Sequence, residues 1–312
     1  MRPHRLWSGE TPWTGPLALV DLTEAGALPE QISLPPCPVL GMGSSTHPLV
    51  RLLDCMIEPP VSAEGIARQV QAAPLAAAVA VDLLRTLPSL PPEQGLAAES
   101  LAYATLQGSA EHAAWLAGRS GAPASPPGQV AVERRADDLV ITLDNPDAGN
   151  AIDHTMRDAL REALTLAELD PTVNRIRLQA VGRCFSLGAE LAEFGSTTDP
   201  ARAHAIRVRT LPAYPAARCA DRLEAHVQGA CVGAGLELAA WAHRITASSD
   251  AWFKLPELAM GIIPGAGGCV SLTRRIGRQR TALMILSGKR ISARQALAWG
   301  LIDAIVDEPP AD

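Results

Sequence analysis

Residues 226–248 read HVQGACVGAGLELAAWAHRITAS, and this stretch decides the fold class of the chain. The pattern predicts a strand over 224–228, the start of a helix over 233–242 and a second strand over 244–248. The Gly/Ala run before the helix leaves N–H groups in its first turn that have no partner inside the helix, and such groups can bind an anion. Small residues also permit close packing of a helix on a strand, and the residues alone leave these two interpretations equally open.

Strands and helices alternate on both sides of this stretch. Apolar runs predict strands over 139–143 and 175–180, and amphipathic stretches predict helices over 155–169, 271–287 and 292–299. The chain has two segments of small residues: the first, FSLGAEL at 185–191, can supply another backbone donor to the same anion, and the Gly/Ala run at 229–235 is the second. Neither segment has the pattern of a dinucleotide-binding or phosphate-binding loop. The alternation indicates an α/β fold.

The part of the chain before these elements is organised differently. Residues 120–129, SGAPASPPGQ, predict a linker between an N-terminal region, 1–119, and a core of residues 130–312. In the N-terminal region we expect short strands over 17–22 and 39–42, a helical stretch over 63–87 broken at Pro74, and a helix over 95–117. The region is therefore predicted to be mostly helical.

The composition argues against several classes of function. The 312 residues carry a formal net charge of −6, which argues against general binding of nucleic acid. No apolar run reaches the roughly 18 residues that span a bilayer, and the chain starts without the apolar core of a signal peptide. The six cysteines have no metal-ligand spacing. We therefore expect a cytoplasmic protein with reduced, mostly buried thiols, no metal site and no membrane partner.

Two glutamates lie among apolar residues. Glu237 is part of GLELAAWA, and Glu257 is part of FKLPELAMG. Burial of a carboxylate is unfavourable unless the group is paired, protonated or functional, and burial raises its pKa toward the range that proton transfer needs. The alternative is a pair of half-exposed surface glutamates, but the lack of polar neighbours favours a functional role.

From about residue 130 to residue 306 the chain resembles the crotonase (enoyl-CoA hydratase/isomerase) superfamily. The resemblance rests on five segments in the family's order, namely ITLDNPDAGNAI, CFSLGAELAEF, HVQGACVGAGLELAAWAHRITAS, AWFKLPELAMGIIPGAGG and SGKRISARQALAWGLIDAIV. It implies a crotonase-type spiral of ββα units behind the mostly helical N-terminal region. It also implies assembly as a homotrimer or as a dimer of trimers.

The same resemblance implies a site and an activity. The backbone N–H groups of Ala189 and Ala234 would bind the thioester oxygen, and Glu237 and Glu257 would share the acid and base roles. The implied substrate-binding positions are Gly188, Gly233, Asn150 and Ala151. The implied reaction is the hydration of a 2-enoyl-CoA thioester to the 3-hydroxyacyl-CoA, a step of fatty acid metabolism. Coenzyme A is part of this substrate, so no separate cofactor is expected.

Departures from the family pattern leave other functions open. Ala234 stands where the family usually has glycine, and Glu190 replaces an aspartate. The basic residues that often precede Asn150 and hold the coenzyme A phosphates are absent. The basic stretch within 274–290 is a candidate replacement, with a solvated helix face or a subunit contact as the alternative. The alternatives to hydration are double-bond isomerisation or another crotonase chemistry, and a catalytically silent assembly subunit.

Two further expectations concern the surroundings of the site. The segments APLAAAVAVDLL and GLAAESLAYATLQGSAEHAAWLAGR of the N-terminal region resemble the last helices of the family. They suggest a degenerate or permuted crotonase-like half, with an unrelated helical extension as the alternative. The variable segment 195–220, which includes His204 and Tyr214, is expected to line the acyl pocket, whereas His226 is expected to be a hydrogen-bonded core residue.

Overall fold

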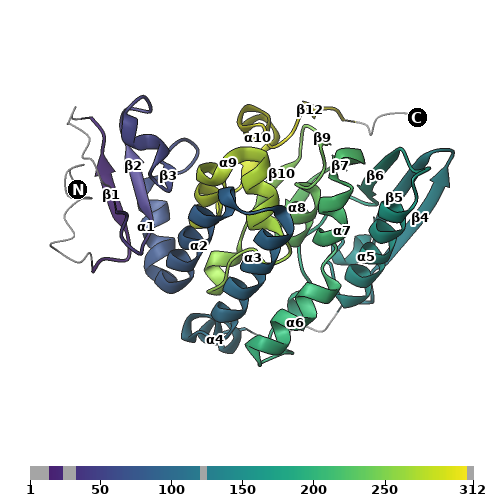
Figure 1. The fold of residues 1–312 in the computed structure, drawn as a ribbon, viewed down its shortest axis with the longest axis horizontal. Coiled ribbons are helices and arrows are strands. Elements are labelled where there is room, and N and C mark those ends of the chain that lie inside the picture. The colour runs from purple at the N-terminus through teal and green to yellow at the C-terminus, as the bar shows by residue number, and fades with distance from the viewer. Residues whose placement is uncertain (1–13, 24–32, 120–124, 308–312) are drawn as a thin grey trace.

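The structure is a computed structural model that describes residues 14–23, 33–119 and 125–307. Within these ranges the strands form three sheets. Figure 1 shows the sheet of the first three strands at one end of the molecule and the edge of the largest sheet at the other end. Helices from both regions of the chain lie between them.

The largest sheet has six strands in the order β12-β9-β7-β6-β5-β4. They are β4 (Gln129–Arg135), β5 (Asp138–Asp144), β6 (Arg175–Ala180), β7 (Leu223–Val227), β9 (Arg244–Ala247) and β12 (Ala304–Ile305). β4 pairs with β5 in antiparallel orientation, and the other neighbouring strands are parallel. The connection from β5 to β6 contains α5 (His154–Leu169), whose N-terminus is capped by Asp153. Parallel strands joined through helices confirm the predicted α/β class.

A smaller sheet contains part of the second segment of small residues, the run at 229–235. Its strands also lead to the two helices that carry Glu237 and Glu257. Its strands, in the order β11-β10-β8, are β8 (Ala230–Val232), β10 (Trp252–Lys254) and β11 (Ile291–Ser292). β8 leads into α8 (Ala234–Ala239), and β10 leads to the 3-10 helix η7 (Glu257–Met260). Because β8 and β10 are parallel neighbours, α8 and η7 both follow the same edge of this sheet.

Four further helices of the core pack around these sheets. They are α6 (Pro200–Thr210), α7 (Ala213–Arg218), α9 (Gly268–Ser287) and α10 (Ala293–Trp299). The helix predicted over 271–287 begins earlier, at Gly268, and is interrupted at Gly277, which adopts φ +79°. The helix predicted over 233–242 ends at Ala239.

The N-terminal region contains a sheet as well as helices. Its strands β1 (Ala18–Asp21), β2 (Val39–Met42) and β3 (Cys55–Met56) run parallel in the order β1-β2-β3. Its helices are α1 (Ala63–Ala72), α2 (Pro74–Thr86), α3 (Pro92–Gln107) and α4 (Ala110–Ala117). The single helix predicted over 95–117 is wrong, because the chain turns at Gly108 and Ser109, and the Ser109 hydroxyl then accepts the His112 N–H to cap α4.

The N-terminal region packs tightly on the core. α2 and α3 contact α9, α3 also contacts α6, and one cluster of buried apolar side chains extends through both regions. Residues 120–124 of the predicted linker lie outside the described residues, and β4 begins at Gln129. No single helix in the described ranges combines the length and the apolar character that a membrane crossing requires, although the bent pair α1–α2 does so when joined.

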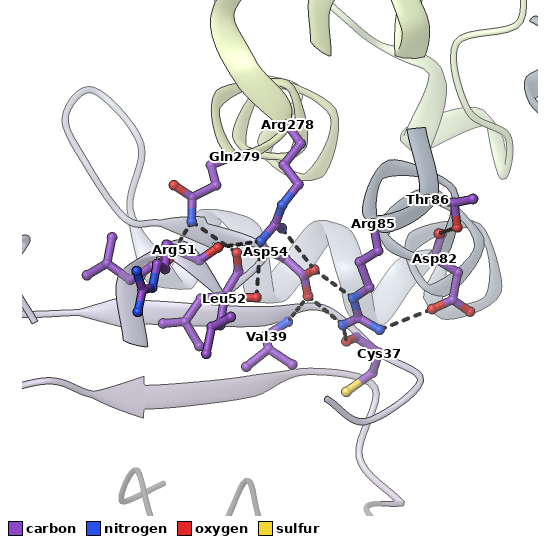
Figure 2. A network of polar contacts seen from close by, with 12 residues as sticks. Cys37, Val39, Arg51, Leu52, Asp54, Asp82, Arg85, Thr86, Arg278 and Gln279 are labelled. Carbon is purple, nitrogen blue, oxygen red and sulfur yellow. Dashed lines mark hydrogen bonds and ion pairs between the residues drawn. The ribbon is translucent and has the colours of Figure 1, made fainter. Parts of the chain in front are cut away.

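A buried ion-pair network fastens the three-stranded sheet to the helices (Figure 2). Asp54 is 2% exposed, and its carboxylate accepts hydrogen bonds from the Val39 N–H at 2.8 Å and from Nε and Nη2 of Arg85 at 2.8 and 2.7 Å. Arg278 of α9 lies on the other side, with Nη1 at 3.8 Å from Oδ1 of the same carboxylate. Asp54 therefore joins β2, α2 and α9.

We expect Asp54→Asn to lower the free energy of unfolding by about 3 kcal/mol, because it leaves two half-buried guanidinium groups without their anion. Chemical denaturation followed by circular dichroism gives this value. Asp82→Asn is the matched control, since Asp82 bonds the same Arg85 guanidinium at 3.1 Å from a side chain that is 58% exposed. Pairs of that kind contribute about 1 kcal/mol or less. Equal losses in the two variants would contradict the role given to Asp54.

Candidate active site

A cavity of about 270 Å³ lies between the core and helix α3. Its wall brings together both segments of small residues and both glutamates that the sequence singles out, namely Gly188, Ala189, Gly233, Ala234, Glu237 and Glu257. Asn150 and Ala151 are not part of this wall, whereas the next residues, Ile152 and Asp153, are.

The first small-residue segment presents the N–H of Ala189. The Ile152 N–H donates to the Gly188 carbonyl at 2.8 Å, and the Glu190 N–H donates to the Ile152 carbonyl at 3.0 Å. The Gly188 N–H donates to the hydroxyl of Ser186 at 3.1 Å. Between these bonded groups, the N–H of Ala189 has no partner in the described part of the chain.

The second segment presents the N–H of Ala234, the first residue of α8. Gly233 before it adopts φ +47° and ψ −125°, and its carbonyl accepts the Glu237 N–H at 2.8 Å. The N–H of Ala234 has no partner among the described residues, as is usual at the start of a helix. The left-handed conformation falls on Gly233 and not on Ala234, so alanine at position 234 is compatible with this turn.

The two segments lie against each other. The Ser186 N–H donates to the Ala230 carbonyl, and the Val232 N–H donates to the Ser186 carbonyl, both at 3.0 Å. A Cβ atom on Gly188 would lie 3.1 Å from the Val232 carbonyl oxygen, and one on Gly233 would lie 2.7 Å from Oε1 of Glu257. Glycine at these two positions allows the close approach. Two unpartnered N–H groups in one cavity wall are suited to stabilising an oxyanion.

Glu237 lies in the first turn of α8 and is 2% exposed. Its Oε2 atom accepts the N–H groups of Ala266 at 2.7 Å and Gly268 at 2.8 Å. Burial raises the pKa of Glu237 to about 7, although these backbone donors act in the opposite direction. A carboxyl group with this pKa can accept or release a proton near neutral pH.

Glu257 is the first residue of η7 and is also buried. Its Oε2 atom has no hydrogen-bond partner within the described ranges. Burial, and next the charge of Glu237, raise the pKa of Glu257 well above its usual range. The surroundings therefore favour the protonated form of Glu257. Burial of both glutamates excludes the alternative of two surface side chains.

Asn150 lies outside the cavity wall and is fully buried. Its Oδ1 atom accepts the Asn145 N–H at 2.8 Å, and its Nδ2 atom donates to the carbonyls of Val181 and Cys184 at 2.9 Å each. Its own carbonyl accepts the hydroxyl of Ser186 at 2.8 Å. These bonds order the turn before α5 and support the segment that carries Ala189.

The basic stretch within 274–290 does not line the cavity. Arg275 donates to the Leu301 carbonyl and pairs with Asp303, Arg278 pairs with Asp54, and Arg280 pairs with Glu58. Arg290 lies over the ring of Trp252, 4.0 Å from its centre. These four arginines therefore contact other parts of the chain, whereas Arg274 and Lys289 are exposed, and the role of the stretch as a phosphate site stays a prediction.

Other expectations from the sequence have mixed outcomes. Segment 195–220 does line the cavity, but His204 and Tyr214 are not in the wall, and Nδ1 of His204 is 2.9 Å from the hydroxyl of Ser100. His226 is buried and bonded to the Thr246 hydroxyl, as predicted. Five of the six cysteines are buried and all six are free thiols. Among the described residues no group of His, Cys, Asp and Glu could hold a metal ion.

The contribution of α3 to the site was not predicted from the sequence. Tyr103 and Gln107 of this helix line the cavity, and Glu99 is buried one turn before Tyr103. The signal for Glu99 was present, because it lies in AAESLAY, an apolar setting of the kind that singled out Glu237. The pairing of α3 with the core, however, has no local signal.

Comparison with known proteins finds matches over the core. A family model described as enoyl-CoA hydratase/isomerase matches residues 133–310. The chain is 32% identical over 178 residues to the mevalonyl-coenzyme A hydratase of Beauveria bassiana, a match that covers 54% of this chain and 64% of that protein. It is 33% identical over 177 residues to the 2,3-dehydroadipyl-CoA hydratase of Escherichia coli, covering 57% and 69%. The chain thus spans less than two thirds of the fungal relative.

Solved structures match the same part of the chain. The crystal structure of an enoyl-CoA hydratase from Thermoplasma volcanium has a TM-score of 0.51 at 37% sequence identity, and the match covers 57% of this chain and 72% of that chain. The likeness confirms the predicted crotonase-type architecture of the core.

Proposed function

The chain belongs to the enoyl-CoA hydratase/isomerase family, and we propose that it adds water to a 2-enoyl-CoA thioester to give the 3-hydroxyacyl-CoA. One observation carries the proposal, namely that two buried glutamates and two unpartnered backbone N–H groups meet in a single cavity. The names of the two relatives given above describe hydratases of CoA thioesters, which supports the same class of reaction.

The backbone donors would stabilise the charge that develops during the reaction. When water attacks C3 of the enoyl group, negative charge moves to the thioester oxygen. The N–H groups of Ala189 and Ala234 would donate to this oxygen and hold the enolate. Removal of one donor of this kind typically lowers kcat by about 10²–10³-fold.

The two glutamates would move the protons. Glu237 takes a proton from the water whose oxygen bonds to C3, and Glu257 gives its proton to C2. The pKa of Glu237, about 7, suits the base, and the higher pKa of Glu257 suits the acid. One turnover leaves the proton on Glu237 and the charge on Glu257, so a proton must pass between them, directly or through the next water, before the cycle repeats.

Crotonyl-CoA and its longer homologues test this proposal through the absorbance of the conjugated thioester. Hydration removes this absorbance and yields a product heavier by one water, which mass spectrometry identifies. A gain of the absorbance from a 3-enoyl-CoA would indicate isomerisation instead. No change with either substrate, together with no binding of CoA thioesters by calorimetry, would support a silent subunit. Trimeric assembly and a cytoplasmic location stay predictions.

A further inference from the structure

Glu99 belongs to α3 in the N-terminal region, yet its carboxylate binds the start of α9 in the core. The residue is 1% exposed. Its Oε1 atom accepts the Gly267 N–H at 2.7 Å, and its Oε2 atom accepts the N–H groups of Cys269 at 2.8 Å and Val270 at 3.3 Å. Both oxygens are therefore committed to backbone donors, and the proposed reaction uses neither of them.

The same backbone segment holds Glu237. Oε2 of Glu237 accepts the N–H groups of Ala266 and Gly268, whereas Glu99 accepts those of Gly267 and Cys269. Consecutive N–H groups from 266 to 269 thus point alternately to the two carboxylates. The segment lies between a carboxylate from the core and a carboxylate from the N-terminal region.

This segment packs closely against the side chains on both sides of it. Gly267 adopts φ +107°, a Cβ atom on Gly268 would overlap the side chain of Glu237, and one on Gly265 would overlap the ring of Tyr103. Tyr103 follows Glu99 by four residues and so lies on the same face of α3. The ring and the carboxylate of one helix face therefore hold the segment at two points.

We propose that Glu99 is a positioning residue for Glu237, so that the N-terminal region completes the active site of the core; this inference rests on the proposed hydratase function. By holding the amides at 267, 269 and 270, Glu99 fixes the amides at 266 and 268 that orient Glu237 in the cavity wall. Glu99 itself is not in that wall. Orientation matters because a misplacement of about 1 Å can lower a rate by about 10²-fold.

Glu99 also interacts electrostatically with the two glutamates of the site. Burial raises the pKa of Glu99, Glu237 and Glu257, and the charge of Glu237 raises the pKa of the other two further. When carboxyl groups interact in this way, their apparent pKa values belong to the group as a whole. Removal of one carboxylate then lowers the highest of these pKa values. Glu99 would thus help the site to keep a proton at higher pH.

Glu99→Gln tests the inference in the full chain. Glutamine keeps the size of the side chain but points an NH₂ group at one set of backbone donors. With crotonyl-CoA we expect kcat to fall by about 10- to 100-fold at a nearly unchanged KM. We also expect the alkaline limb of the kcat–pH profile to move down by roughly one pH unit. If Glu99 had a purely structural role, the substitution would reduce the amount of folded enzyme and leave the pH midpoint of the alkaline limb unchanged.

Two more variants complete the comparison. Glu93→Gln is the matched control on the same helix, because Glu93 is exposed and pairs with Arg218 at 2.7 Å, and it should leave kcat, KM and the limb unchanged. Glu99→Asp keeps the charge but shortens its reach, so it should lower kcat without moving the limb. It also serves as the test if the glutamine variant does not fold, and a wild-type kcat in Glu99→Asp would then overturn the inference.

The outcomes separate this inference from the proposed function. Hydration by the wild type together with an unchanged rate and pH profile in Glu99→Gln would overturn the inference alone. A wild type that does not hydrate would overturn the function. In that case ¹³C NMR titration of the glutamate carboxyls tests Glu99, with lower titration points for Glu237 and Glu257 expected in Glu99→Gln. Unchanged titration points would contradict the inference.

Discussion

Glu257→Gln is expected to lower the kcat of crotonyl-CoA hydration by about 10²–10⁴-fold, the usual contribution of a positioned acid or base. The proton for C2 comes from this carboxyl group in the proposed reaction, and a glutamine amide cannot supply it. KM should change far less, because the backbone N–H groups of Ala189 and Ala234 are untouched by the substitution. Steady-state loss of the conjugated absorbance measures both constants.

Companion variants show whether the two glutamates act together. Glu237→Gln should lower kcat by a similar factor, and the double variant should fall well short of the product of the single effects, because groups that act as a unit are not additive. Glu224→Gln is the control, since Glu224 lies on β7, outside the cavity wall, with a side chain that is 26% exposed. Hydration near the wild-type rate by Glu257→Gln would exclude the proposed mechanism.

Several strands and helices of the core could be predicted from the sequence, because the signals for these elements are local. The apolar run at 139–143 indicated β5, and the boundary at Asp170-Pro171 marked the end of α5. The pattern over 224–248 predicted a strand, the start of a helix with free N–H groups and a second strand, and the structure has β7, α8 and β9 at these places. In each case a few neighbouring residues determine the backbone conformation.

The elements that the sequence reasoning missed depend on distant contacts. β8, β10 and β11 have two or three residues each, which is too short for a periodic pattern, and they pair only after the chain has folded back. The bond from the Gly267 N–H to Glu99 joins residues 168 positions apart. The break between α3 and α4 was missed because apolar residues continue across Gly108 and Ser109 at nearly helical spacing.

In the candidate site, too, short local motifs predict some features, whereas other features depend on contacts between distant residues. Short motifs indicated Glu237, Glu257, Ala189 and Ala234, and the structure brings all four into one cavity wall. Asn150 also belongs to a motif, but its side chain is fully used by backbone groups of two loops, and it adopts φ +52° within a tight turn. A motif alone does not distinguish a residue that touches substrate from one that shapes the turn beside it.

Ala234→Pro is expected to lower kcat by about 10²–10³-fold, because proline lacks the N–H that would bind the thioester oxygen. The backbone suits this substitution. Ala234 is the first residue of α8, where proline is tolerated, and Gly233 before it has no Cβ atom and lies outside the α conformation that a following proline disfavours, with ψ −125°. The donor at Ala189 remains, so part of the oxyanion stabilisation should persist and leave hydration measurable.

Ala110→Pro is the matched control for this substitution. Ala110 is the exposed first residue of α4, after the cap residue Ser109, and it lies outside the cavity wall. Thermal unfolding of both variants should stay close to that of the wild type. Because the two variants make the same change at the same helical position, a loss of hydration in Ala234→Pro alone separates the missing donor from any general effect of proline. Hydration at the wild-type rate by Ala234→Pro would show that the thioester oxygen is bound elsewhere, and would remove the functional reason for the close approach of Gly188 and Gly233.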